Sequence, residues 1–404
     1  MNEQEIIKEA QRCLNCKNPK CKEACPLHVD IPKMIDHVKR AEFEEAYRID
    51  NESNPLGIIC GLICPHEKQC QGSCVRGIKE KPVSIGAIEH YVCSVSKSVQ
   101  ITHKSKLNIN SKVAIIGGGP AGISCAHELS KENIKSTIFE KESLLGGILM
   151  YGIPDFRLDK KLVVESIDKI LDENIEIKFG MEYNEKSDKL NIAKLKEDGY
   201  EYIFISTGLD SNKKLYIPGT NSNRVLYAND YLRDYYKKEN NISKNSKVAV
   251  IGGGNVAIDT ARVAKKLGND VTIIYRKTRE KMPANNEEVE SSIEEGVKFI
   301  FETNVIRVEE QDGLKLYLDN NEEYLVDYLI IAIGSTTNEE IMKNVLINKE
   351  TGLIFINENL ETKEKNVFAG GDIINNKGTV ASAINDGIRV AKSIIENEKH
   401  KKTT

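Results

Sequence analysis

Cysteine is the most unevenly distributed residue of this chain: nine of the ten cysteines lie before residue 94, and only Cys125 lies after it. Iron–sulfur clusters need several thiolates that converge on one group of irons, and short loops supply them. In two-cluster ferredoxin-type runs, the cysteine before a proline serves the other cluster. The spacing therefore predicts one cluster on Cys13, Cys16 and Cys21, and a second that uses Cys25. The two runs are Cys13-x2-Cys16-x4-Cys21-x3-Cys25-Pro26 and Cys64-Pro65-x4-Cys70-x3-Cys74, with Cys60 just upstream.

A pair of structural zinc sites is the alternative interpretation of these cysteines. Zinc sites usually contain paired CxxC units or mixtures of cysteine and histidine. Here only one CxxC occurs, and redox domains follow, so iron–sulfur clusters are favoured. A disulfide framework would need an oxidising compartment, and the first twenty residues contain no apolar export signal.

An internal repeat dominates the rest of the chain. The sequence from Lys112 to Ile123, which contains three consecutive glycines, recurs 135 residues later from Lys247 to Ile258. Each copy predicts a short strand, a glycine turn and a helix, followed by a second strand at residues 136–140 or 271–275. Two such βαβ units predict two nucleotide-binding domains.

The first copy predicts an FAD site. Its loop matches GxGxxG, in which the first glycine makes the turn, the second admits the pyrophosphate and the third lets helix and strand pack. Glu140 ends the second strand, where it can accept from a ribose hydroxyl. The turn from Phe368 to Asp372 is suited to hold a ribityl chain, although it could be a plain β-turn. The residues of the loop are Gly117, Gly119, Pro120, Ala121 and Gly122.

The second copy predicts an NADPH site. An acid at the end of its second strand would repel a 2′-phosphate, but the position that corresponds to Glu140 is Tyr275, and cations follow it. A solvated basic loop is the alternative. The expected contact residues are Gly252, Gly254, Asn255, Val256, Ala257, Arg276, Lys277 and Arg279.

These elements predict an α/β protein with an N-terminal α-helical bis-[4Fe–4S] domain and two Rossmann-like domains of the glutathione-reductase type. The expected domains are residues 1–108 for the clusters, 109–220 with 334–404 for FAD, and 221–333 for NADPH. Within them we expect helical stretches at residues 31–47 and 381–396, and buried strands at 328–334 and 366–373. Residues 103–111 are polar and predict a linker.

Composition argues against several classes of function. The formal net charge is −4, which does not indicate a nucleic-acid surface. The longest apolar runs are far shorter than a membrane span, so we expect no membrane association and a cytoplasmic location.

The chain resembles the small (beta) subunit of NADPH-dependent glutamate synthase. It is also similar to the matching half of dihydropyrimidine dehydrogenase and to the large subunit of NADH-dependent reduced ferredoxin:NADP oxidoreductase. The resemblance covers the whole chain and is carried by the first cysteine run, Cys64-Pro65, both glycine loops, the turn before Asp372, and the segments 82–86, 151–158 and 282–284.

The resemblance implies how the cysteines are shared between two clusters. Cys13, Cys16, Cys21 and Cys74 would hold one, and Cys25, Cys64 and Cys70 would hold the other with Glu89 as fourth ligand. Cys60 and Cys93 would be spare, and either could replace Glu89. The resemblance also suggests that residues 146–160 run past the flavin toward the cluster domain. We further expect cofactor contacts from Lys141, Gly147, Arg157, Thr207, Gly208, Gly371, Asp372 and Thr379.

These expectations define an electron-transfer protein that takes hydride from NADPH onto FAD and passes electrons through two [4Fe–4S] clusters. No side-chain acid or base is required, so we expect no catalytic residue. One hypothesis is an electron-input subunit for glutamate synthase, which forms L-glutamate from glutamine and 2-oxoglutarate on a partner chain. A second is a ferredoxin-linked NADP oxidoreductase or a stand-alone diaphorase, and a third is a non-enzymatic redox or metal sensor. Self-association into a homo-oligomer is left open.

Overall fold

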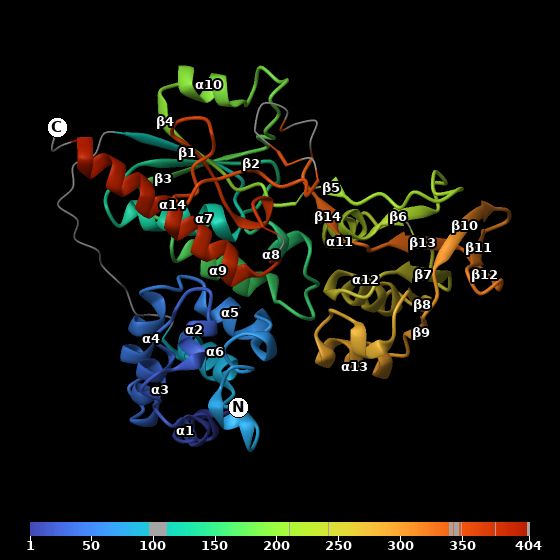
Figure 1. The fold of residues 1–404 in the computed structure, drawn as a ribbon, viewed down its shortest axis with the longest axis horizontal. Coiled ribbons are helices and arrows are strands. Elements are labelled where there is room, and N and C mark those ends of the chain that lie inside the picture. Colours follow the sequence, from blue (N-terminus) through green and yellow to red (C-terminus); the bar gives the residue numbers. More distant parts are fainter. Residues whose placement is uncertain are drawn as a thin grey trace. The chain divides into compact units, whose positions relative to one another are not determined.

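The computed structural model describes residues 1–96, 111–209, 211–240, 242–338, 342, 347–348, 350–375 and 377–401 (Figure 1). The chain forms two compact units. The first contains residues 1–149, 158–208 and 337–404, and the second contains residues 150–157 and 209–336. The predicted linker lies outside the described residues except for Ser111. The division into three domains stays a prediction.

The first unit begins with a small helical bundle. Its apolar centre contains Ile6, Met34, Leu56, Ile59 and Ile88, all of them fully buried. The stretch expected to be helical at residues 31–47 is two helices, because the backbone reverses at Ala41, whose φ is +57°. The helices are α1 (Glu3–Gln11), α2 (Lys20–Ala24), α3 (Ile31–Lys39), α4 (Phe43–Asn51), α5 (Gly57–Ile63) and α6 (Ile85–Val95), with short 3₁₀ turns η1 (His66–Lys68) and η2 (Val75–Ile78).

The rest of the first unit is built around a five-stranded sheet covered by helices. All neighbouring strands are parallel, in the order β15-β4-β1-β2-β3. Gly387 lets two of the helices that cover it come very close, since a Cβ added there would lie 2.1 Å from the carbonyl oxygen of Ala121. The strands are β1 (Lys112–Ile116), β2 (Ser136–Glu140), β3 (Ile175–Phe179), β4 (Tyr200–Ile205) and β15 (Val367–Ala369); the helices are α7 (Pro120–Ser130), α8 (Ile148–Tyr151), α9 (Lys160–Asp168), α10 (Ile192–Glu197) and α14 (Val380–Lys401), with the turn η4 (Gly371–Ile373).

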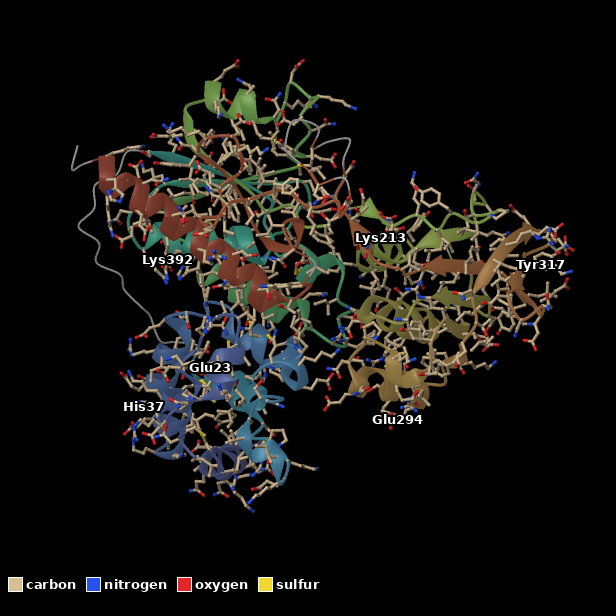
Figure 2. The ribbon with its side chains drawn as sticks, in the orientation of Figure 1. Glu23, His37, Lys213, Glu294, Tyr317 and Lys392 are labelled. Carbon is tan, nitrogen blue, oxygen red and sulfur yellow. The ribbon has the colours of Figure 1, made fainter. Side chains whose placement is uncertain are left out.

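The second unit repeats this architecture. Its parallel sheet has the order β6-β13-β7-β8-β9. An antiparallel meander, β10-β11-β12, lies beside it, and Tyr317 of β11 is at its exposed end (Figure 2), where the Arg307 guanidinium lies 3.7 Å from the ring centre. The elements are β5 (Ser211–Asn212), β6 (Val225–Tyr227), α11 (Ala228–Lys237), β7 (Lys247–Ile251), α12 (Asn255–Lys266), β8 (Asp270–Tyr275), η3 (Arg279–Lys281), α13 (Asn286–Glu294), β9 (Lys298–Phe301), β10 (Val305–Glu310), β11 (Leu314–Leu318), β12 (Glu323–Val326), β13 (Tyr328–Ile331) and β14 (Ser335–Thr336).

Residues 150–157 pack with the second unit. The expectation that residues 146–160 run past the flavin toward the cluster domain stays a prediction. The ring of Tyr151 meets that of Tyr236 edge-on, with centroids 5.0 Å apart. Arg157 forms ion pairs with side chains of α12 and α13. Aromatic and ionic contacts therefore fix this segment to the second sheet's helices. Among the described residues, no helix is long and apolar enough to cross a membrane.

Candidate cofactor-binding sites

Four cysteines from three short segments line one pocket in the helical bundle, here called pocket I. Cys13 and Cys16 lie in the loop after α1, Cys21 lies in α2, and Cys74 directly precedes η2. Ile35 of α3 forms part of the apolar wall. The pocket encloses about 400 Å³, including space open to solvent.

A second pocket, pocket II, contains the other predicted ligands. Cys25, Cys64, Cys70 and Glu89 line it, and so does Cys60. Its empty space is about 380 Å³, which includes space open to solvent. The remaining polar lining comes from Asn54, His66 and Gln69, and one lining residue, Ala381, comes from α14 of the neighbouring sheet region. Cys93 does not line either pocket; its thiol donates to Asp50 at 3.5 Å.

The acidic groups of each pocket influence one another. Burial, with a contribution from the Cys13 and Cys74 thiols, raises the pKa of Cys21 to about 11. In pocket II burial is again the main cause, and Cys25 and Cys64 add to it in raising the pKa of Cys70 and of Glu89 well above their usual values. Deprotonated thiols and carboxylates that lie close together repel one another. A bound cation offsets this repulsion and favours their negative forms.

The two sets of donors fit iron–sulfur clusters by their chemistry. Cubanes are held by thiolates that short loops deliver from several directions, as they do here. All ten cysteines are free thiols, so none is consumed by a disulfide. In the part of the chain that the structure describes, no three His, Cys, Asp or Glu side chains are gathered as a site for a single metal ion.

The first glycine loop joins β1 to α7. Gly117 has a φ of +101°, a conformation that L side chains rarely adopt. Gly119 faces open space, and Pro120 with the buried Ala121 begins the helix. A Cβ added at Gly122 would lie 2.1 Å from the Gly117 carbonyl oxygen. The loop therefore leaves an uncovered backbone cradle at a helix N-terminus, which suits a pyrophosphate.

Glu140 ends β2 beside this loop, and Lys141 follows it. The Glu140 carboxylate accepts hydrogen bonds from the N–H groups of Gly118 at 2.7 Å and Glu142 at 2.8 Å. Burial raises the pKa of Glu140, and these two hydrogen bonds partly oppose that rise. The side chain is thus held at the position where an acid meets a ribose.

Other predicted FAD contacts reach the same edge of the sheet, because parallel strands end there together. The hydroxyl of Thr207 is buried without a hydrogen-bond partner among the described residues, as expected of a group that awaits a ligand. Burial raises the pKa of Asp372 to about 6. A Cβ added at Gly147 would lie 3.1 Å from the Gly119 Cα. Thr207 and Gly208 follow β4, Gly371 and Asp372 follow β15, and Thr379 precedes α14, where it bonds Ser382 at 2.7 Å.

The second glycine loop joins β7 to α12 in the second unit. Gly252 has a φ of +146°, Gly254 faces open space, and the buried Ala257 replaces the third glycine. Asn255 accepts from the Asn285 N–H at 2.8 Å, and Val256 follows it in α12. This loop also fits a dinucleotide pyrophosphate.

The specificity position differs from that of the first copy. The ring of Tyr275 packs beside Gly253, and its hydroxyl donates to the Lys281 carbonyl at 2.8 Å. Arg276 and Lys277 are exposed and form no ion pair with another described residue, whereas Arg279 pairs with Glu290.

Arg157, predicted as a cofactor contact, belongs to the second unit. Its guanidinium bonds Asp259 at 2.7 Å and Glu288 at 3.1 Å, in the second unit. Arg262, which also pairs with Glu288, stacks over Phe156 at 4.5 Å. No motif in the sequence signals these carboxylates, nor the residues Asn54 and Asp50 beside Glu89; only the packing of separate helices brings them together.

Comparisons with known proteins agree with this architecture. Residues 111–387 match the family model described as pyridine nucleotide-disulphide oxidoreductase, and residues 1–101 match that of dihydropyrimidine dehydrogenase domain II, 4Fe-4S cluster.

Two curated relatives cover nearly the whole chain. The NAD-dependent dihydropyrimidine dehydrogenase subunit PreT of Escherichia coli K12 is 31% identical over 392 residues, which cover 96% of this chain and 93% of that protein. The glutamate synthase [NADPH] small chain of the same organism is 28% identical over 431 residues, covering 96% and 90%.

Among solved structures, FprA of Mycobacterium tuberculosis in complex with NADPH has a TM-score of 0.62 at 16% identity and covers 72% of this chain and 86% of that one. Thioredoxin reductase of Lactococcus lactis has a TM-score of 0.56 at 20% identity and covers 72% and 100%. These two likenesses show the fold, and together with the two family matches they confirm the predicted class of an N-terminal iron–sulfur domain followed by a Rossmann-like α/β region. The chain belongs to the pyridine nucleotide-disulphide oxidoreductase family, in the group of iron–sulfur flavoproteins that includes PreT and the glutamate synthase small chain.

Proposed function

We propose that this chain is an NADPH-dependent FAD and iron–sulfur oxidoreductase that delivers electrons to a partner subunit; its likeness to the glutamate synthase [NADPH] small chain supports this role. Pocket II is the observation that carries the proposal, because it joins the predicted cluster ligands to the FAD region. Ala381 lies in the first turn of α14, two residues after Thr379, and it lines pocket II. The groups assigned to FAD and those assigned to a cluster are therefore neighbours.

The two pockets suggest an order for the electron path. Pocket I is lined only by residues of the first 96, whereas pocket II also has a lining residue from α14. Pocket II is accordingly assigned to the cluster nearer the flavin and pocket I to the one nearer the partner. FAD, when bound, divides a two-electron donation into single-electron steps, and clusters accept such steps. The chain's own residues position and insulate these groups.

NADPH is the proposed donor because of the residues after β8. Arg276 and Lys277 are exposed cations that form no ion pair with any residue the structure describes, and Tyr275 supplies no carboxylate to repel a 2′-phosphate.

A second candidate is an NADH-dependent subunit for a pyrimidine-reducing partner, which the likeness to PreT favours. Reduction of the anaerobic protein by NADPH and NADH in parallel distinguishes the donors. A higher kcat/KM for NADPH supports the first proposal, and a higher one for NADH supports the second.

The partner is tested by anaerobic affinity purification from the native host. Co-elution of a glutamine-hydrolysing large chain supports the glutamate synthase role. Co-elution of a flavoprotein that reduces pyrimidines, or of a ferredoxin-linked chain, supports the alternatives.

A further inference from the structure

Three buried polar side chains lie together at pocket II: Asn54 and Glu89 line it, and Asp50 contacts Glu89. Asp50 is 0%, Asn54 1% and Glu89 8% exposed. Asp50 belongs to α4 and Glu89 to α6, while Asn54 lies in the turn that leads from α4 to α5. Burial of such groups is costly unless hydrogen bonds compensate it, so their arrangement needs an explanation.

Asn54 holds Glu89 directly. Its Nδ2 donates to Glu89 Oε1 at 2.8 Å, and this hydrogen bond is buried. The turn itself is fixed, because the backbone N–H of Asn54 donates to the Asp50 carbonyl at 2.9 Å. Both Asn54 and Glu89 line pocket II. An ionised carboxylate offers about four lone-pair sites on its two oxygens, so the contacts of Glu89 with Asn54 and with Asp50 still leave lone pairs for a ligand.

The alternative eighth donors are placed differently. Cys93 is buried with its thiol on Asp50 Oδ2 at 3.5 Å and does not line the pocket. Cys60 lines pocket II, but its thiol is hydrogen-bonded to Cys64, which is itself a predicted ligand. Among these three candidates, Glu89 is the one that lines pocket II and accepts from a neutral amide.

We propose that Asn54 is a positioning residue for the pocket II cluster: its amide fixes Glu89 by one oxygen and so presents the other as the non-cysteine ligand. This inference rests on the proposed function. Partners that orient metal ligands typically change metal retention by about 10–100-fold when they are removed. Because Asn54 acts through Glu89, its effect is confined to one cluster.

Two single variants and one double variant test the proposal in the full-length protein reconstituted with iron and sulfide. Asn54→Ala removes the donor, and Asn54→Asp replaces it with an acceptor of nearly the same shape. In the double variant Asn54→Asp with Glu89→Gln, the hydrogen bond is restored with donor and acceptor exchanged, while an amide oxygen remains for iron. Asn51→Ala is the matched control, since Asn51 is also a buried asparagine of this region but does not line pocket II.

The readouts are the EPR spectrum of the dithionite-reduced protein and the rate of iron loss to a chelator. We expect each single variant to alter one cluster's EPR signal and to speed loss of its iron about 10–100-fold. The other signal and the bound FAD should be unchanged, and the double variant should restore slow iron loss.

Three outcomes would overturn the inference: unaltered spectra and iron loss in both single variants, no recovery in the double variant, or the same change in Asn51→Ala. A wild-type protein that takes up no iron and sulfide would overturn the proposed function as well. A wild-type protein with two clusters and unaffected Asn54 variants would overturn only the role of Asn54.

Discussion

The two glycine loops share a backbone but differ at the side chains that would meet the ligand. In the first copy, Glu140 accepts from the N–H of its own loop at Gly118. In the second, Tyr275 packs against the loop, and exposed cations follow it. The repeat therefore specifies the strand, turn and helix, whereas the few positions where the copies diverge specify what is bound.

The helices that follow the loops are also supported differently. In the first unit α14 packs on α7, with Gly387 against the Ala121 carbonyl. In the second unit the segment 150–157 is fixed on α12 and α13 through ion pairs of Arg157. The first copy thus depends on close backbone packing and the second on buried charge, and four predictions test this contrast, from the largest expected effect to the smallest.

Loss of Arg157 should have the largest effect. Arg157→Met leaves Asp259 and Glu288 without this partner, and breaking a buried ion pair costs about 3–5 kcal/mol. We expect this loss in the free energy of unfolding, measured by chemical denaturation of the FAD-bound protein. Replacing both charged partners with apolar residues, in Arg157→Met with Asp259→Leu, should recover much of the lost free energy of unfolding. An unchanged midpoint in Arg157→Met would show that the segment is not held by charge.

Next, Gly122→Ala should impair FAD binding. The new Cβ would meet the Gly117 carbonyl at 2.1 Å, and overpacking of this kind costs about 1–3 kcal/mol. An energy of this size lowers FAD affinity by about 5–150-fold. The affinity can be measured from the fluorescence of released flavin. The matched change in the second copy, Ala257→Gly, should alter the KM for NADPH much less. Equal and small effects in both copies would remove the distinction between them.

Glu140→Ala should also weaken FAD binding, by no more than Gly122→Ala does. It removes the acceptor of the buried Gly118 N–H, which costs about 1–3 kcal/mol. The expected result is a higher Kd for FAD, with NADPH binding unaffected when FAD is saturating. A variant that binds FAD as the wild type does would contradict the assignment of Glu140 to the ribose.

The smallest effect is expected in the second copy's basic turn. Changing Arg276 and Lys277 together to alanine should raise the KM for NADPH about tenfold, because charge-assisted hydrogen bonds to the 2′-phosphate are lost. The KM for NADH should not change. The wild-type KM for NADPH should also rise with salt, since exposed charges are screened. A parallel change for both nucleotides would instead indicate a general distortion of the turn.

The sequence predicted the fold class well because its signals are local. The repeated strand–turn–helix pattern appears in both sheets, and strands expected at residues 136–140 and 271–275 are β2 and β8. The break between α3 and α4 was not predicted, because a single left-handed residue, Ala41, ends a periodic pattern that continues beyond it.

The sites were predictable only where a motif carries them. Cysteine spacing anticipated two sets of thiols, and two pockets contain them, while their roles as ligands stay predictions. The ion pair of Arg157 with Asp259 and the bond from Asn54 to Glu89 join residues 102 and 35 positions apart on separate elements. Such contacts depend on how helices pack, which periodicity does not encode.

The most direct test of the central claim is an anaerobic titration with NADPH, followed by visible and EPR spectroscopy, of protein whose iron, sulfide and flavin have been assayed. We predict one FAD and about eight iron and eight sulfide atoms per chain. NADPH should bleach the flavin and give EPR signals of reduced clusters. Zinc without sulfide, or a protein whose flavin and clusters stay oxidised with NADPH, would contradict the account.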